Sequence, residues 1–105
     1  MNEYQLINTL KVHGFEISKK ADEYNCSYLK VFFSIISLNN DIWILKLTRQ
    51  SGIFLLALST IQFRPNRIVF LLKTGCRYKI TYKDGKITYY DDNGNQTKLP
   101  NNMVL

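Results

Sequence analysis

The chain is poor in the side chains that bind metals or build disulfide frameworks. It contains one histidine, His13, and two cysteines, Cys26 and Cys76, which stand far apart. A structural zinc site takes four such ligands, and small secreted domains rely on several disulfides. None of the five glycines belongs to a phosphate-binding loop. The sequence therefore predicts no metal, no cofactor and free thiols, as in a cytoplasmic protein.

Long apolar runs are also missing. The longest uninterrupted run extends from Ile53 to Leu58, whereas a helix that spans a bilayer needs about 20 residues. The opening segment MNEYQLINTL carries Glu3 and lacks the basic stretch of a secretory signal. A chain of 105 residues is long enough to bury one core without disulfides. We expect a single globular domain over residues 1–105 that does not enter a membrane.

Acidic residues are outnumbered, because eight Asp and Glu face fourteen Lys and Arg, which gives a net charge of +6. The excess lies in the middle of the chain. Between Ile42 and Tyr90 the cations outnumber a single acid, Asp84, while the segments on either side are slightly acidic. Such an asymmetry favours an anionic partner. That partner is either an acidic protein surface or a nucleic acid.

The sequence does contain one short helical pattern followed by strand patterns. Asn2 and Gln5 match a capping box, and His13-Gly14 ends the helix. The apolar stripe of this helix consists of Leu6, Ile7 and Leu10. FEIS (15–18) begins a strand, and KKADEYN (19–25) is predicted as a loop. Because β-branched and aromatic residues dominate the rest, we predict an α+β fold with an N-terminal helix and a mostly antiparallel, meander-like sheet of five to seven strands.

A central hairpin is predicted from SYLKVFFSIISL (27–38) and DIWILKLTR (41–49). A two-residue turn at Asn39-Asn40 would pair Ile36 with Trp43 and Phe32 with Leu47. Both faces of this hairpin are apolar, so we expect both to be covered. The N-terminal helix can cover one face. A second helix, a bent sheet or a second subunit must cover the other, so a homodimer is one of the expected states.

The segment around residues 52–62 fits two structures. Ser51 can cap a helix that contains the good helix formers Leu55 to Leu58, and GIFLLALS (52–59) equally fits a buried strand. We favour the strand because the neighbouring segments read as a meander, and a second helix is the alternative. Pro65 ends the element in either case.

The segment CRYKITYKDGKITYYDDNGN (76–95) predicts a hairpin about a two-residue Asp84-Gly85 turn, with a second turn at Asn93-Gly94 before a short last strand. In this register Lys83 faces Lys86, which opposes pairing unless an anion binds there. The side chains expected to point inward are Tyr78, Ile80, Tyr82, Ile87 and Tyr89. The site expected to bind an anionic partner consists of Arg64, Arg67, Arg77, Lys79, Lys83, Lys86 and Tyr90.

Nucleophilic catalysis has one candidate, Cys76. Nearby Arg77 and Lys79 would lower the pKa of its thiol, and His13 is the only histidine that could act as its base. His13 is better explained as a helix end, where the helix dipole favours an imidazolium. Cys26 is expected as a buried filler. We therefore predict no catalytic residue, and a small enzyme that uses Cys76 is the second alternative.

The segment LINTLKVHGFEI (6–17) resembles the helix-to-strand opening of HicA-type toxins, which are small RNA-cleaving proteins with a double-stranded-RNA-binding-like fold. In that family a histidine follows in a Gly-Ser-His stretch. Here the following segment, SKKADEYNCSY (18–28), contains no histidine. The resemblance covers about a tenth of the chain and lacks the catalytic element, so membership is not inferred.

The combined observations favour a small, non-enzymatic binding protein that acts by occlusion through its basic face. Residue usage rich in Ile, Lys, Asn and Tyr is typical of AT-rich genes. This usage favours a phage-encoded inhibitor of a host nucleic-acid-handling system, such as a CRISPR nuclease (an anti-CRISPR) or a restriction nuclease. A regulator that binds DNA or RNA directly is the first alternative.

Overall fold

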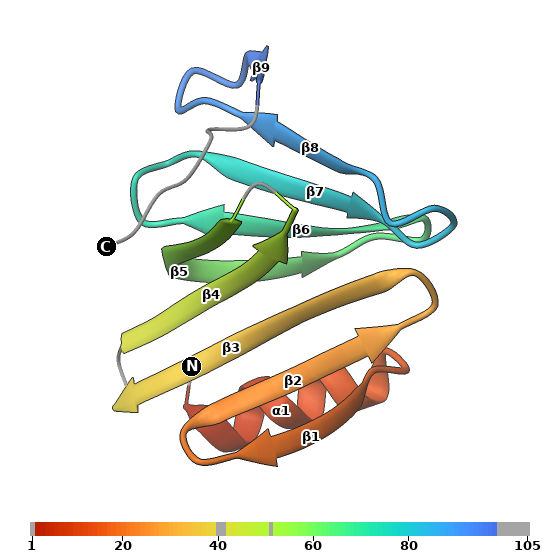
Figure 1. The fold of residues 1–105 in the computed structure, drawn as a ribbon, viewed down its shortest axis with the longest axis vertical. Coiled ribbons are helices and arrows are strands. Elements are labelled where there is room, and N and C mark those ends of the chain that lie inside the picture. The colour runs from red at the N-terminus through yellow and green to blue at the C-terminus, as the bar shows by residue number, and fades with distance from the viewer. Residues whose placement is uncertain (1, 40–41, 51, 99–105) are drawn as a thin grey trace.

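In the computed structural model, which describes residues 2–39, 42–50 and 52–98, one helix is followed by nine antiparallel strands (Figure 1). Strands that follow one another in the chain are neighbours in the sheet throughout, so the order is β1 to β9 without a crossover. The α+β meander is therefore confirmed, with more strands than the five to seven expected. The elements are α1 (Glu3–Val12), β1 (Glu16–Lys20), β2 (Glu23–Tyr28), β3 (Val31–Asn39), β4 (Ile42–Arg49), β5 (Gly52–Phe63), β6 (Arg67–Leu72), β7 (Arg77–Thr81), β8 (Ile87–Tyr90) and β9 (Gln96–Thr97).

Helix α1 begins as its sequence predicts. The Gln5 backbone N–H donates to Asn2 Oδ1 at 2.8 Å, and the Asn2 backbone N–H donates to Gln5 Oε1 at 3.2 Å, which completes the capping box. Leu6 and Leu10 are buried. The helix ends at His13, whose ring stacks on Phe63 with the ring centroids 3.9 Å apart. This stack fixes the end of α1 against the end of β5.

The predicted loop over residues 19–25 is wrong, because most of it forms strands. Strand β1 continues through Lys20, a tight turn occupies Ala21 and Asp22, and β2 begins at Glu23. Strand β1 lies at the edge of the sheet and exposes four of its five residues. Since an exposed edge strand needs no apolar alternation, its sequence carries little strand signal.

The central hairpin forms, but its predicted register is wrong by one residue. Ile36 faces Ile44 and Ser37 faces Trp43, because a bulge lies between Ser37 and Asn39. Asn40, the second residue of the predicted turn, lies outside the described residues. A slip of one residue moves a whole strand's side chains to the other face of the sheet. The inner face of the hairpin therefore carries Val31, Phe33, Ile35, Trp43, Leu45 and Leu47, all of them buried.

The long strand β5 folds the meander into two layers. Its first half pairs with β4 and its second half pairs with β6, with a bulge between Leu58 and Thr60. This confirms the strand over residues 52–62 and rules out the second helix there; Ser51, its proposed cap, lies outside the described residues. The two layers pack face to face. Between them the rings of Phe33 and Phe70 are in contact, with their centroids 4.8 Å apart.

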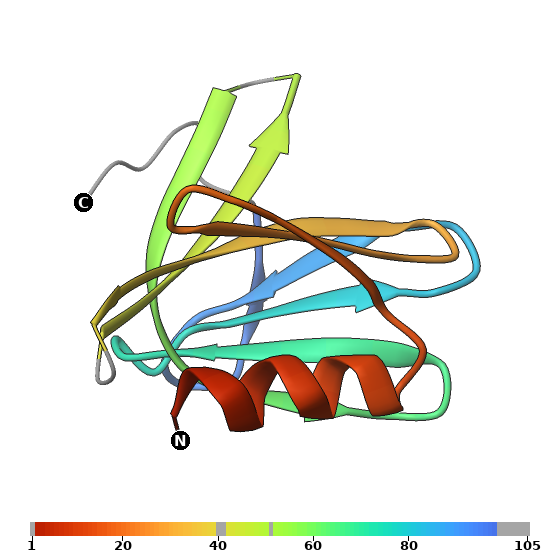
Figure 2. The same cartoon turned by 90° about the horizontal axis from the view of Figure 1, so that it is seen from below.

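The helix and the bent sheet cover the same side of the β3–β4 hairpin. Figures 1 and 2 show α1 on the side of β1 to β3 that also faces β6 and β7. No described residue covers the opposite side of β3 and β4, where Ile42 is 40% exposed and Phe32 is 70% exposed. We expected the helix on one side and a second helix, a bent sheet or a second subunit on the other. The second helix is ruled out and the bent sheet lies on the helix side, so the homodimer stays a prediction.

The β7–β8 hairpin keeps its predicted faces but not its predicted register. Ile80 faces Ile87, which is a slip of two residues, and the hairpin closes where the Thr81 backbone N–H donates to the Lys86 carbonyl at 3.1 Å. Lys83 therefore does not face Lys86, and the like-charge pair predicted at the turn is wrong. A slip of two residues leaves the faces unchanged. Of the residues expected inward, Tyr78 and Ile80 are buried, and the other three (Tyr82, Ile87 and Tyr89) pack against the core.

The last described strand is β9, a short strand after the turn that contains Gly94, as expected. Residues 99–105 lie outside the described part. Among the described residues, α1 is the one helix, and it is too short and too polar to cross a membrane.

Candidate functional site

The outer side of the layer formed by β6, β7 and β8 carries most of the predicted site. Strand pairing sets its side chains in three rows. The first row is Arg67 and Thr81, the second is Val69, Lys79 and Thr88, and the third is Leu71, Arg77 and Tyr90. Successive rows on one face of a strand are about 6.6 Å apart. We name this surface the basic face, and its polar members are Arg67, Arg77, Lys79, Thr81, Thr88 and Tyr90.

No acid interrupts the basic face, since β6, β7 and β8 contain no Asp or Glu over their described lengths. Two acids flank these strands in the chain. Asp91, directly after Tyr90, is engaged by its own turn, where the Asn93 and Asn95 backbone N–H groups donate to its Oδ1 at 3.0 and 2.9 Å. Asp84, after β7, is engaged by its own loop in the same way. Its carboxylate accepts a hydrogen bond from the Thr81 hydroxyl and another from the Lys86 backbone N–H at 2.9 Å. These hydrogen bonds lower the pKa of Asp84, and the one from Thr81 contributes more than the one from Lys86. Among the described residues, no ion pair joins either carboxylate to a cation of the basic face.

Tyr90 is held against a cation of the same face. Lys79 Nζ lies 4.2 Å from the centroid of the Tyr90 ring, a cation–π contact. One side of the ring is thus already occupied. This contact weakens the interpretation of Tyr90 as a platform on which a base stacks, and it fixes both side chains as parts of one cationic surface.

The remaining predicted cations lie at one end of the molecule, next to the basic face. Lys83 and Lys86 flank the turn of the β7–β8 hairpin, and this loop packs on two other turns. The Lys30 backbone N–H donates to the Tyr82 carbonyl at 3.3 Å, and the Tyr82 N–H donates to the Asn66 carbonyl at 3.1 Å. Figure 1 shows the β2–β3, β5–β6 and β7–β8 turns together at this end. We name this surface the turn cluster, and its cations are Lys30, Arg64, Lys83 and Lys86.

Lys30 was not predicted as part of the site, because it is far from the β7–β8 hairpin in sequence. Only the folding of the meander brings the β2–β3 turn against that hairpin. Arg64 was predicted, but its guanidinium is turned back toward its own strand, with Nη2 at 3.3 Å from Gln62 Oε1. Arg67 Nη1 similarly donates to Asn66 Oδ1 at 2.8 Å. The two arginines are therefore partly engaged by neutral side chains, and their charges remain.

A second surface feature lies on the other layer of the molecule, on the outer side of β1 to β4. There a hollow of about 440 Å³ has residues of these four strands around it, including Ser27, Phe32, Ser34, Lys46 and Thr48. It lies where β3 and β4 separate. Their backbone pairing ends at Ser34 and Lys46, although both strands continue beyond this pair. Phe32, at its rim, is 70% exposed.

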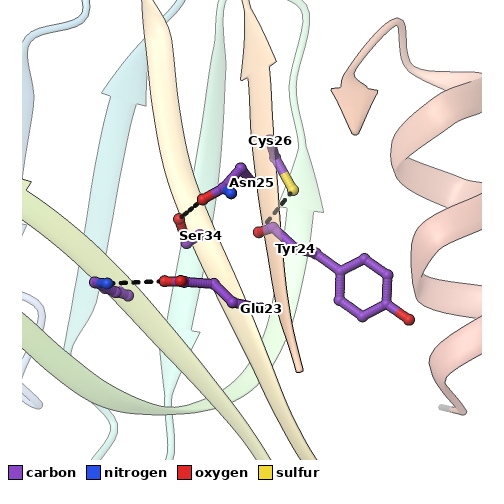
Figure 3. Close-up of polar contacts among 6 residues, drawn as sticks. Glu23, Tyr24, Asn25, Cys26 and Ser34 are labelled. Carbon is purple, nitrogen blue, oxygen red and sulfur yellow. Dashed lines mark hydrogen bonds and ion pairs between the residues drawn. The ribbon is translucent and has the colours of Figure 1, made fainter. Parts of the chain in front are cut away.

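Two polar pairs lie at or beside the hollow (Figure 3). The Ser34 hydroxyl donates to Asn25 Oδ1 at 2.7 Å, and Lys46 Nζ lies 2.9 Å from Glu23 Oε1. Figure 3 shows Tyr24 directed away from these pairs, toward the helix. The Tyr24 hydroxyl donates to Glu3 of α1. The lining of the hollow thus combines hydroxyl and amide groups with one negative and one positive side chain and with apolar side chains that include Phe32.

The structure does not bring the residues of the predicted nucleophilic pair together. His13 stacks on Phe63, which faces Ile68 at the start of β6, whereas the Cys76 carbonyl accepts from Leu72 at the end of β6. The length of β6 separates the two side chains. A hydrogen bond with Cys76 raises the pKa of Tyr89. Cys26 is buried as expected, and burial raises the pKa of its thiol to about 12.

Within residues 2–39, 42–50 and 52–98 there is no group of three or more His, Cys, Asp and Glu side chains that could hold a metal ion. No protein-family model, no curated protein and no solved structure matches this chain. The candidate site is therefore defined by the basic face and the turn cluster alone.

Proposed function

We propose that this protein is a small, non-enzymatic binding protein that blocks an anionic surface of its partner by docking its basic face on it. The observation that carries this proposal is the placement of Arg67, Lys79 and Arg77 on successive rows of one sheet face that has no carboxylate. Rows of like charge cost folding stability through mutual repulsion, and an anionic partner relieves this cost.

An acidic protein surface suits this face better than the bases of a nucleic acid. The face is built from rigid strands, and its one outward aromatic ring is already covered on one side by Lys79. Cations on a rigid surface steer and orient an acidic partner and mainly accelerate the encounter. Recognition of single-stranded nucleic acid usually relies on free aromatic rings between cations. Binding by occlusion needs no reactive group. Among the described residues, the predicted nucleophilic pair of Cys76 and His13 is not brought together.

In its specific form, the proposal is an inhibitor of a host nucleic-acid-handling system, such as a CRISPR or restriction nuclease. Residue usage typical of AT-rich genes, as found in many phages, supports this form. On such a target the basic face would dock on an acidic surface and cover it. The protein would then act in the cytoplasm of the host cell.

The test is a pull-down from a host lysate, with and without nuclease treatment, using a variant of the basic face. In Arg67→Gln/Arg77→Gln/Lys79→Gln the positive charge is lost but the long side-chain stems stay. The matched control, Lys11→Gln/Arg49→Gln/Lys98→Gln, removes the same charge at exposed positions elsewhere. We expect a protein partner that survives nuclease and binds the face variant at least about tenfold more weakly, while the control binds normally.

Three outcomes would contradict this proposal. If nuclease treatment releases everything bound, the protein binds nucleic acid directly, and its affinity should then fall steeply with salt. If the face variant and the control lose binding equally, net charge and not the face is responsible. If Cys76→Ala abolishes the biological activity while binding persists, the enzymatic alternative is revived.

A further inference from the structure

The outer side of β3, β4 and β5 forms a second, chemically different surface. Its apolar side chains lie in register: Ile36 faces Ile44, which in turn faces Ala57 on β5, and Leu55 lies beside Lys46 in the next row. Ile42 and Ile53 extend the surface at its ends and are 40% and 45% exposed. We name this surface the open face, and its apolar members are Phe32, Ile36, Ile42, Ile44, Ile53 and Leu55.

The open face is electrically neutral, although the molecule carries a charge of +6. Lys46 is paired with Glu23 across β3, and on the adjoining edge strand Glu16 and Lys20 balance each other. The two layers pack their inner faces together, so the basic face lies on the opposite side of the molecule. A second positively charged copy therefore meets the least repulsion at the open face, whereas an anionic partner is drawn to the basic face.

The shape of the open face also matches a second copy of itself. Phe32 projects from it, and the hollow of about 440 Å³ lies next to Phe32 on the same face. A two-fold contact brings the same surface together twice, so a projection and a hollow on one face can each fill the other. A buried cavity of about 150 Å³ holds a benzene molecule. The hollow therefore has room for a phenyl ring.

We infer that the protein forms a two-fold symmetric homodimer through the open face, with Phe32 of each copy seated in the hollow of the other. The rows of Ile36 and Ile44 pack beside this contact and complete the apolar centre of the interface. Such a centre surrounded by neutralised polar groups is typical of homodimer interfaces. The dimer does not depend on the proposed function, because it uses the opposite side of the molecule.

The dimer has a consequence for binding. It presents its two basic faces outward on opposite sides, so one dimer can hold two anionic surfaces. Linking two binding faces in this way raises the apparent affinity for a partner that is itself multivalent, without any new contact. A monomeric variant should therefore bind a single immobilised partner as the wild type does and lose only the gain from multivalency.

Sedimentation equilibrium of the purified protein at concentrations up to roughly 100 μM tests this inference, since most specific dimers are populated there. The wild type should be dimeric. Phe32→Ala removes the projection and Ser34→Arg fills the hollow, and each should weaken dimerisation at least about tenfold. Val12→Ala, at an equally exposed apolar residue of α1, should leave it unchanged. Thermal unfolding of each variant establishes that it is folded.

A mixture of the two interface variants gives the sharpest result. In the mixed dimer, Phe32 of the Ser34→Arg chain meets the hollow of the Phe32→Ala chain, which keeps Ser34 and is widened by the loss of its own Phe32 ring. One of the two contacts is therefore restored. The mixture should associate more tightly than either variant alone. A monomeric wild type at all concentrations would overturn the inference, and so would a mixture that associates no better than its components. Neither result would affect the proposed function, which is tested at the basic face.

Discussion

Tyr78 is the largest fully buried side chain, and its hydroxyl has no hydrogen-bond partner among the described residues. A buried hydroxyl without a partner loses its hydrogen bonds to water and gains none in exchange. Tyr78→Phe should therefore keep the free energy of unfolding or raise it by up to about 1 kcal/mol. Urea unfolding measures this change. Tyr24→Phe is the contrasting variant and should lower stability, because the Tyr24 hydroxyl donates to Glu3.

Two buried groups that lose a proton at high pH, the Cys26 thiol and the Tyr78 hydroxyl, make the stability of the fold sensitive to alkaline pH. Burial raises the pKa of Cys26 from 9.0 to about 12, and that of Tyr78 from 10.0 to about 12. Below pH 9 both groups are protonated in the folded and the unfolded chain, and their contribution to stability is complete. Above pH 9 these groups lose their protons in the unfolded chain before they do so in the folded chain. The free energy of unfolding therefore falls as the pH rises, until the pH passes the pKa of the folded state. The fall is up to about 1.4 kcal/mol per pH unit for each group.

Urea unfolding between pH 8 and 11 checks this dependence. Cys26→Ala should flatten the fall that begins near pH 9, and Tyr78→Phe should flatten the part that begins near pH 10. Tyr4→Phe, at a residue that is 78% exposed, is the control and should leave the profile unchanged. A wild-type profile that is flat over this range would contradict the prediction.

At the scale of the elements, one glycine fixes how the β7–β8 hairpin meets the β2–β3 turn. Gly85 has a φ of +69°, and a Cβ atom there would lie 2.5 Å from the Lys30 carbonyl oxygen. Gly85→Ala should therefore cost about 2–4 kcal/mol, from the backbone conformation and from the displaced contact together. Gly94→Ala is the matched control, since its φ is +85° but nothing lies within 4 Å of its Cβ. It should cost only about 1–2 kcal/mol in the same denaturant experiment.

The elements also show where sequence patterns stop being informative. The helix was predictable because its capping box and apolar stripe are local. The faces of the β7–β8 hairpin were predictable because alternation survives a slip of two residues. The β3–β4 register was not, because both faces of that hairpin are apolar and no polar residue marks the correct pairing. The bulge between Ser37 and Asn39, which sets the register, has no distinct signal in the sequence.

At the scale of the whole molecule, some residues of the site were also predictable from local sequence and others were not. Arg77 and Lys79 lie on one face, as the period of a strand predicts, whereas the pairing of β6 with β7 places Arg67 on the same face. Lys30 could not be predicted, because its place beside the β7–β8 turn depends on the bend of β5, which folds the meander into two layers. The open face was hidden for the same reason: the sequence shows an apolar hairpin, and only the fold shows which side stays uncovered.

The gathering of cations on one side of the molecule should weaken the fold at low ionic strength. The basic face and the turn cluster carry like charges without carboxylates between their strands, so these charges repel one another in the folded state. Sodium chloride shortens the range of this repulsion to about 3 Å at 1 M. The free energy of unfolding should therefore rise as salt is added. Urea unfolding over a salt series measures this rise.

Lys83→Gln/Lys86→Gln tests whether the placement of the charges causes the effect. Both lysines are exposed, so the exchange leaves the core intact. It should raise stability at low salt by a few tenths of a kcal/mol and flatten the salt dependence. Lys11→Gln/Lys98→Gln removes the same charge from exposed positions outside the basic face and the turn cluster, and it should keep the wild-type slope. Equal slopes in the two double variants would assign the effect to net charge, because only clustered cations make the position of the exchange matter.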